Sequence, residues 1–247
     1  MRAILTYHSI DDSRSPISIS PDQFLAHQRW FARRKVRVLP LADLLNHPAG
    51  GEDALAITFG DGFKNTLEPA ASLLADGIPV SFFIVSRHVG STNAWRGAGD
   101  PGIPTMPLLD WDDLERLKAQ GAEIEAHTRT HPRLTSLSDS VIDEELAGSQ
   151  SDLAARLGAR ASHFAYPYGD LDSRVAGRAR KFFAHAYTTT FSVLGPEADP
   201  MLLPRLDMFY FRRHAGLETW GTARFSNRLR WIAAKRRIRE FLTAKGR

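Results

Sequence analysis

Three short segments of the sequence hold residue types that could bind a metal ion and perform hydrolytic chemistry. They are TFGDG at 58–62, HTRTH at 127–131 and FAYPYGD at 164–170. His127 and His131 are four positions apart and can face one metal ion from a helical turn or a tight loop, and Asp61 can supply a third ligand. Two imidazoles and one carboxylate leave coordination positions open for water and a substrate oxygen. Such an ion acts as a Lewis acid and activates water near neutral pH.

The composition limits where a metal ion could bind. The 247 residues contain no cysteine, which excludes disulfide frameworks, thiolate zinc sites, iron–sulfur clusters and cysteine nucleophiles. With 43% hydrophobic and 24% charged residues, the chain has the composition of one ordinary globular domain. No apolar run approaches the ~20 residues of a membrane span, and the apolar stretch in MRAILTYHSIDD is too short for a signal peptide, so a cytoplasmic protein is expected.

Short apolar runs alternate with amphipathic stretches, as is typical of a β/α protein. The expected strands cover 3–7, 36–39, 55–59, 80–85, 123–126, 164–166 and 186–190. The expected helices cover 21–34, 41–46, 66–76, 111–120, 138–157 and 171–182, with a long Gly- and Pro-rich loop at 90–107 and a last apolar segment at 202–211. Asp61, His127 and residues 167–169 each follow the C-terminal end of a strand. At this edge β/α barrels and open α/β sheets build their sites.

Taken together, the segments resemble the polysaccharide deacetylases of the NodB-homology type, carbohydrate esterase family 4. The signatures of that family are a TFDDG-like strand end, an H-[ST]-x-x-H loop and an x-P-Y segment. The resemblance extends over most of 1–210 and includes the opening ILTYHSI and the segment LPRL at 203–206. It implies an α/β fold, a distorted (β/α)7 barrel, and metal-dependent hydrolysis of an N-acetyl group on a hexosamine.

The resemblance also implies roles for particular residues. Asp61, His127 and His131 correspond to the metal ligands, which would hold Zn²⁺, or Co²⁺ or Ni²⁺ in its place. The substrate site would be lined by Tyr166, Pro167 and Tyr168, with backbone groups of the 166–169 turn donating to the oxyanion. The implied substrate is an N-acetylated glycan or a lipid-linked glycan precursor. An alternative for both tyrosines is a place in the core, with the hydroxyl bonded to backbone.

One position departs from the family pattern. The family pairs two aspartates, the first as general base for the attacking water, and here Gly60 stands at the first position. General-base assistance contributes about 10²–10⁴-fold to a rate. Three accounts compete: the chain is a catalytically silent relative that still binds glycan, the base comes from elsewhere, or Gly60 is an introduced substitution. Glu123, Glu125 and Asp170 are the acidic candidates for a replacement base. A related hydrolysis, such as deformylation of an aminosugar or cleavage of another non-peptide amide, is a further alternative.

Two more residues are candidates for the catalytic machinery. Many family members protonate the leaving amine with a histidine in a late Leu-x-His motif, and the sequence has no such motif in its C-terminal part. The subgroup that opens with a YHxI-like segment uses its early histidine, so His8 is the candidate general acid. Arg205 is similar to an arginine that orients the base aspartate. The alternatives are a buried His8 bonded to a backbone carbonyl and an Arg205 that caps one.

The charge is unevenly distributed. Residues 224–247 hold nine Lys or Arg and one Glu, a net charge of +8, which leaves 23 basic and 27 acidic residues in 1–223. We therefore expect a barrel over 1–223 and a basic helical tail over 224–247. Its apolar residues are Leu229, Trp231, Ile232, Ile238, Phe241 and Leu242. Such a tail favours peripheral binding to the anionic inner face of the cell membrane, with a plain solvated helix as the alternative. Nucleic-acid binding is not expected, because the barrel is acidic and shows no recognisable module.

Overall fold

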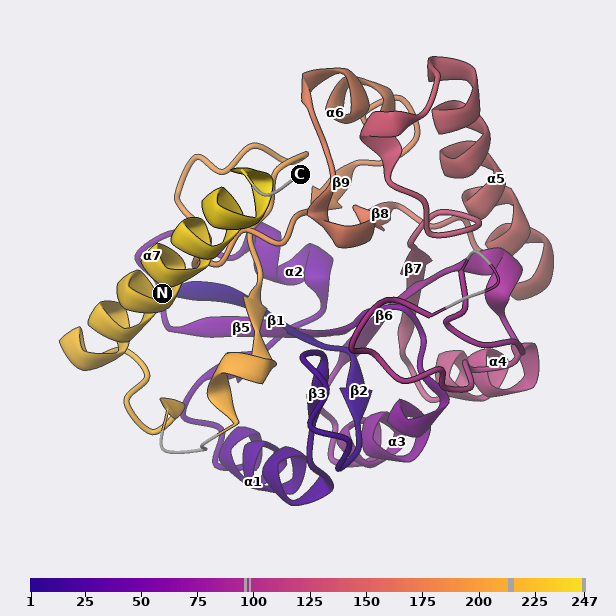
Figure 1. Cartoon of the computed structure of the whole chain (residues 1–247). Helices are drawn as coiled ribbons and strands as arrows, with labels where there is room; N and C mark the ends of the chain where they lie inside the picture. The colour runs from indigo at the N-terminus through magenta and orange to yellow at the C-terminus, as the bar shows by residue number, and fades with distance from the viewer. Residues whose placement is uncertain (96, 98, 213–215, 246–247) are drawn as a thin grey trace.

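A parallel sheet forms the centre of the molecule in the computed structural model, which describes residues 1–95, 97, 99–212 and 216–245. The strands follow the order β10-β1-β5-β6-β7-β8-β9 around the sheet (Figure 1). Their bounds are β1 Arg2–Tyr7, β5 Ala54–Phe59, β6 Val80–Ile84, β7 Glu123–Ala126, β8 His163–Ala165, β9 His185–Tyr187 and β10 Leu206–Asp207. Most expected strands are confirmed within one or two residues, and β9 ends three residues earlier than expected.

The segment 203–207 closes the sheet into a barrel. Leu203 pairs with Tyr187 at the end of β9, and three residues later Leu206 and Asp207 pair with Leu5 and Thr6 of β1. One short segment thus joins the two edges of the sheet. The expected α/β architecture, a distorted (β/α)7 barrel in a single domain, is confirmed.

Helices cover the outside of the barrel (Figure 1). They are α1 Pro21–Ala32, α2 Leu41–Asn46, α3 Leu67–Ala75, α4 Trp111–Ala119, α5 Asp139–Leu157, α6 Ser173–Ala179 and α7 Ala223–Lys245. Local chemistry sets several of their ends. Ser20 and Gln23 form a capping box at the start of α1, with Pro21 in the first helical position. Gly158 ends α5 in the left-handed region at φ 68°.

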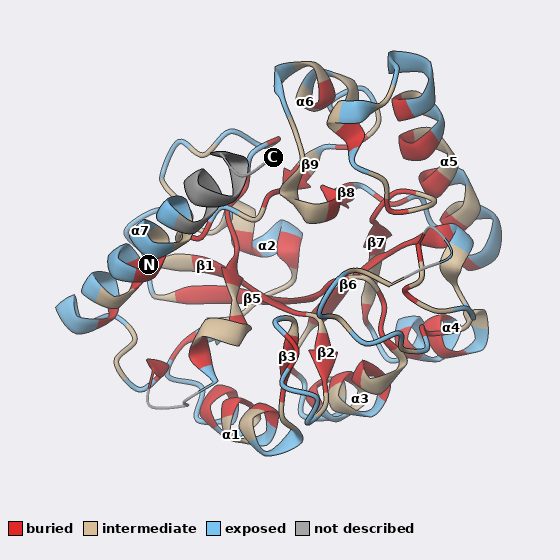
Figure 2. Cartoon of the chain, in the orientation of Figure 1, coloured by how far each residue is buried: buried red, intermediate tan, exposed pale blue. Residues whose placement is uncertain are grey.

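The strands carry the core (Figure 2). Every residue of β5 is buried, and the Phe59 ring stacks between Tyr7 and Phe82 at 5.5 and 4.8 Å between ring centroids. There are three further strands of two residues each: β4 Arg37–Val38, which pairs with β5, and the pair formed by β2 Ser9–Ile10 and β3 Ser18–Ile19. The β2–β3 pair was not expected, because two-residue strands leave no periodic pattern in a sequence.

The basic tail forms α7, which packs along the barrel. Phe225, Leu229 and Ile232 are buried, and the Phe225 ring contacts those of Phe211 and Trp220. Trp231 and Ile238 remain 59% and 60% exposed on the same helix. The side chains of Phe241 and Leu242 lie outside the described residues. Among the described helices, none combines the length and apolarity that crossing a bilayer requires.

Candidate active site

Asp61 follows directly on β5, in the turn 60–62. Its backbone is left-handed at φ 66°, and the Gly62 N–H donates to the Gly60 carbonyl at 2.7 Å. Left-handed backbone is uncommon for a residue with a side chain and marks a turn held by its surroundings. The turn brings the Asp61 carboxylate to the C-terminal edge of the barrel, where the segment after β7 also ends.

The histidine loop follows β7. Thr128 and His131 have left-handed backbone at φ 64° and 58°. Nδ1 of His127 donates to the Ala165 carbonyl at 2.7 Å, which leaves the Nε2 lone pair free to point at a ligand position. Sequence reasoning missed Glu145 of α5, whose carboxylate accepts the N–H groups of Arg129 and Thr130 at 2.8 and 2.9 Å. Glu145 is more than ten positions away from the loop in the sequence, so no short sequence pattern indicates that it binds the loop backbone.

The three expected ligands converge. Nε2 of His127 and Nε2 of His131 lie 3.1 and 3.5 Å from Oδ1 of Asp61, and the three ligand atoms all lie within 4.8 Å of one another. Nitrogen and oxygen ligands about 2.1 Å from a tetrahedral zinc ion are about 3.4 Å apart. The spacing therefore suits a small divalent cation.

The pKa shifts of Asp61 and His131 favour the protonation states that bind a metal ion. Burial opposes ionisation of Asp61, but its contacts with His127 and His131 hold its pKa well below the usual range. Burial lowers the pKa of His131, although the Asp61 carboxylate acts in the opposite direction. The site thus presents a carboxylate and a neutral imidazole, which are the forms that bind metal ions.

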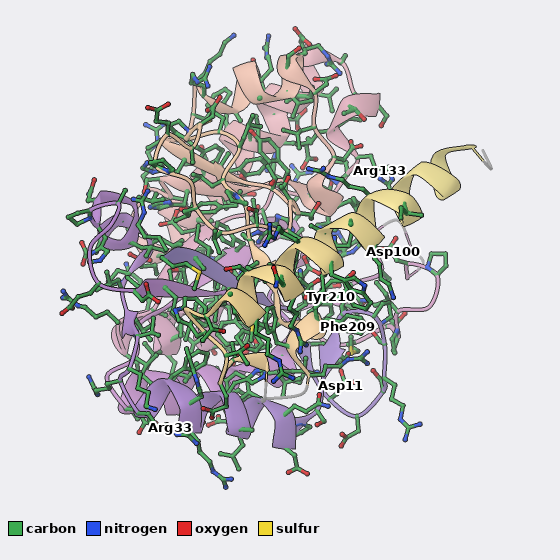
Figure 3. The ribbon with its side chains drawn as sticks, turned by 90° about the vertical axis from the view of Figure 1, so that its left-hand side faces the viewer. Asp11, Arg33, Asp100, Arg133, Phe209 and Tyr210 are labelled. Carbon is green, nitrogen blue, oxygen red and sulfur yellow. The ribbon has the colours of Figure 1, made fainter. Side chains whose placement is uncertain are left out.

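Aromatic rings wall the site. The His131 ring lies 4.5 Å from both Trp95 and Tyr168, measured between centroids. Tyr168 has left-handed backbone at φ 59° in the turn η4, Pro167–Gly169, and its hydroxyl donates to Asp100 Oδ2 at 3.2 Å. The Arg133 guanidinium lies 4.6 Å from the centroid of the Tyr168 ring. Figure 3 shows the labelled Arg133 and Asp100 toward the same edge of the molecule.

Tyr166 does not share this position. Its ring is completely buried and packs edge-on against Phe164 at 5.0 Å, so its side chain belongs to the core. Burial raises the pKa of its hydroxyl. The interpretation that Tyr166 lines the substrate site is therefore corrected for its side chain: β8 directs it inward, whereas the left-handed turn directs Tyr168 outward. Pro167 is buried at the start of η4 and shapes the turn.

The corner beside Gly60 holds His8 and Arg205. A Cβ atom added at Gly60 would lie 2.7 Å from Cδ2 and 2.9 Å from Nε2 of His8, so the His8 ring fills the space of a side chain at position 60. Arg205 is buried, donates from Nε to the Thr188 carbonyl at 3.0 Å, and makes no ion pair with any described carboxylate. Burial lowers its pKa to about 10.

The three acidic candidates for a replacement base are engaged elsewhere. Glu123 accepts hydrogen bonds from Ser81 and the Leu41 N–H. Glu125 accepts the N–H groups at the start of β8, at the end of the barrel opposite the site. Asp170 accepts the N–H and hydroxyl of Thr135 at 2.9 and 2.8 Å. Among the described residues, none of the three carboxylates contacts the side chains of Asp61, His127 or His131.

Comparisons with known proteins agree with this geometry. The sequence profile described as "Polysaccharide deacetylase" matches residues 47–186. The chain is 22% identical over 183 residues to the Bacillus subtilis protein YxkH, covering 72% of this chain and 60% of that protein. It is 21% identical over 203 residues to the poly-beta-1,6-N-acetyl-D-glucosamine N-deacetylase of Staphylococcus epidermidis, covering 76% of this chain and 67% of that enzyme.

A solved structure shares the fold. IcaB from Ammonifex degensii superposes with a TM-score of 0.71 at 24% identity, covering 83% of this chain and 90% of that one. The chain spans about 60% of the length of the first curated relative that it matches.

Proposed function

The chain belongs to the polysaccharide deacetylase family, and on that premise we propose that it is a metal-dependent hydrolase that removes N-acetyl groups from an N-acetylhexosamine glycan. The observation that carries this proposal is the convergence of Asp61, His127 and His131 within 4.8 Å at the C-terminal edge of the barrel. The S. epidermidis relative is named for N-deacetylation of an N-acetylglucosamine polymer, which supports the same substrate class.

In this proposal Asp61, His127 and His131 hold a divalent cation, with Zn²⁺ favoured by the two imidazoles and one carboxylate. When bound, the ion polarises the amide carbonyl and activates water. Tyr168 positions the acetamide against the His131 ring, and donors of the 166–169 turn stabilise negative charge on the carbonyl oxygen. His8 protonates the leaving amine as the C–N bond breaks, so acetate and a free amine are the products.

A second candidate is a relative with impaired or silent catalysis that still binds glycan. Its support is the corner at Gly60, where the His8 ring occupies the volume that an aspartate would need and Arg205 makes no ion pair with a described carboxylate. Without a carboxylate base, the rate would fall by about 10²–10⁴-fold.

Acetate release from N-acetylglucosamine oligomers with Zn²⁺, Co²⁺ or Ni²⁺ separates the two candidates. Wild type, Gly60→Asp and Asp61→Asn are compared, with Gly60→Ala as the steric control because it displaces His8 without adding a carboxylate. Metal-dependent turnover by wild type that Asp61→Asn abolishes supports the deacetylase. Activity only in Gly60→Asp supports the silent relative, and no activity in any variant overturns the deacetylase proposal. Formate release from an N-formyl aminosugar tests the related deformylation.

We further propose that α7 holds the protein at the anionic inner face of the cell membrane. The support is the exposure of Trp231 and Ile238, 59% and 60%, on a tail with nine basic residues and one acidic one. Removing the whole helix is not a clean test, because Phe225 is part of the core.

The cleaner test of the membrane proposal is co-sedimentation with anionic liposomes. Trp231→Ser/Ile238→Ser should lower the binding constant by about tenfold or more, since each buried apolar side chain contributes about 1.5–3 kcal/mol. Leu202→Ser is the matched control, because Leu202 is 44% exposed on the barrel outside α7. Equal binding by all three proteins contradicts the proposal.

A further inference from the structure

A cavity of about 580 Å³ lies beside the candidate active site, between the turn η4, the loop after β9 and the C-terminal half of α7. Side chains that donate hydrogen bonds line it: Tyr168, Thr189, Thr190, Ser192, Arg236 and Arg237. None of the described residues that line it is acidic. Two guanidinium groups and several hydroxyls without a carboxylate favour an anionic ligand.

Arg236 is held in a fixed position at this cavity. Its Nη2 donates to the Thr189 carbonyl at 3.0 Å, and its guanidinium lies 5.8 and 5.5 Å from the ring centroids of Phe191 and Tyr210. Figure 3 shows Tyr210 beneath the middle of α7. Because a guanidinium has five N–H donors, one such bond orients the group and leaves most of its donors for a ligand. A fixed arginine loses less entropy when it binds an anion.

Further positive charge lies nearby. Burial is the main cause of the lowered pKa of Arg205. The positive charge of Arg236 lowers that pKa further, because the two guanidinium groups repel each other electrostatically. Arg133 lies over the ring of Tyr168 at 4.6 Å. Carboxylates balance part of this charge: Asp100 accepts the Tyr168 hydroxyl at 3.2 Å, and Asp170 lies 4.0 Å from the Arg133 guanidinium. Arg236 and Arg237, by contrast, line a cavity whose described lining residues include no carboxylate.

Tyr168 connects the cavity to the metal ligands. It lines the cavity, and its ring lies 4.5 Å from the ring of His131. Tyr168 is thus shared by the cavity and by the aromatic wall of the candidate metal site. The cavity is placed to receive a group attached to the same substrate molecule.

A second cavity of about 210 Å³ continues along α7. The two cavities share Phe191, Ser192 and Ala233. The other residues that line the second one are Met1, Val193, Leu229, Ser226 and Arg230. We call the two cavities together the groove. Along α7 its lining changes from the hydroxyl and guanidinium groups of the first cavity to the mainly apolar side chains of the second.

We propose, on the basis of the deacetylase function above, that this groove binds an aminosugar carrying a phosphate and a hydrocarbon chain. The sugar lies at Asp61, the phosphate at Arg236 and Arg237, and the first carbons of the chain against Phe191 and Leu229. Arginine donates to phosphate through two parallel N–H groups, and the apolar cavity removes hydrocarbon from water. The substrate class is thus an N-acetylhexosamine glycan that is linked through a phosphate to a lipid.

Binding of three small probes tests the groove without requiring turnover. Farnesyl phosphate carries the phosphate and the chain, methyl phosphate carries the phosphate alone, and farnesol carries the chain alone. Isothermal titration calorimetry on the full chain should show the tightest binding for farnesyl phosphate. Equal affinity for farnesol overturns the phosphate assignment, and equal affinity for methyl phosphate overturns the hydrocarbon assignment.

Three variants locate the site. Arg236→Ala and Arg237→Gln should each weaken farnesyl phosphate binding by about tenfold, since a hydrogen bond to a charged group contributes about 1.5–3 kcal/mol. Arg237→Gln removes charge from an exposed side chain and keeps the Arg236 anchor, so it tests the phosphate without loosening α7. Arg224→Gln removes an exposed charge from the same helix outside the groove and should bind as wild type.

The outcomes separate this proposal from the deacetylase function. Binding that the groove variants weaken, together with no acetate release from any substrate, supports the groove and overturns the deacetylase. Acetate release from uncharged oligomers with no farnesyl phosphate binding supports the deacetylase and overturns the groove. Equal weakening by Arg224→Gln and Arg237→Gln overturns the site assignment, because it shows a diffuse charge effect.

Discussion

Two groups of two histidines and one carboxylate can be compared among the residues that the structure describes, and of these two the ligand atoms converge in one. The active-site cluster is Asp61, His127 and His131. The interior cluster is Glu125, His163 and His185, and its histidine rings stack face to face, 5.0 Å apart with planes at 17°. Stacked rings direct their nitrogens past each other rather than toward one point. The same residue types thus give a candidate ligand set in one place and packing in the other.

Hydrogen bonding explains the difference. In the interior cluster, Nδ1 of His163 lies 2.6 Å from the Tyr187 hydroxyl, and Glu125 accepts the N–H groups of Ser162 and His163. These atoms of Glu125 and His163 are engaged within the barrel wall, whereas the buried Nδ1 of His185 has no hydrogen-bond partner among the described residues. In the active-site cluster, only Nδ1 of His127 bonds to backbone, and both Nε2 atoms face Asp61. A metal site needs side chains that converge, which residue composition alone does not provide.

The largest expected difference between the clusters is in zinc affinity. Asp61→Asn removes a charged candidate ligand, and we expect the zinc dissociation constant to rise by at least about 10²-fold. Losing a residue that only hydrogen-bonds to a metal ligand already lowers affinity by up to about 10²-fold. Glu125→Gln is the matched control in the interior cluster and should leave zinc affinity unchanged. Titration with a zinc-buffered competitor dye measures both. Equal affinities in the two variants would show that Asp61 is not a ligand.

A smaller loss of zinc affinity is expected from the support of the histidine loop. Glu145→Ala removes the acceptor of the Arg129 and Thr130 N–H groups and should weaken zinc binding by about 10–100-fold. Glu144→Ala is the control, because Glu144 is the neighbouring residue, its side chain is 66% exposed, and it contacts only Arg129 Nη1 among the described residues. If both variants bind zinc equally, the loop holds its shape without Glu145.

For the interior cluster we expect an effect of Glu125 on how the free energy of unfolding changes with pH. Burial raises the pKa of Glu125 to about 8, with Glu123 acting in the same direction and the backbone N–H groups opposing it. An unfolded glutamate titrates near ~4.3, so the native state binds the proton more tightly than the unfolded state between these values. The stability from this group is present at low pH and is lost as the pH rises through about 8.

Glu125→Gln removes that titration. Thermal unfolding between pH 7 and 9 should show wild type losing stability while Glu125→Gln changes less, so that the variant gains on wild type toward pH 9. The range avoids His163, whose pKa burial lowers to about 4 and which therefore acts below pH 7 with the opposite sign. Parallel curves for both proteins would contradict a protonated Glu125 in the native state.

Local patterns in the sequence were enough to predict most of the helices and strands. The Ser20, Pro21 and Gln23 pattern started α1 at the correct residue, and the apolar runs placed the strands of the barrel. The three candidate ligands, Asp61, His127 and His131, were also chosen from their types, their spacing and their positions after strands, and the structure brings them together. These features depend on neighbours a few positions away in the chain, which a sequence displays directly.

The tertiary structure decided what depends on distant residues. It placed Tyr166 in the core and Tyr168 at the site, two positions apart in one motif, because a left-handed turn separates them. It packed His8 against Gly60 and brought α7 beside the active site, where Arg236 meets Thr189. By itself the sequence determined most of the helices and strands and the set of candidate ligands. Only the folded chain decided which side chains converge and what lines the groove beside them, because these contacts join residues that lie far apart in the chain.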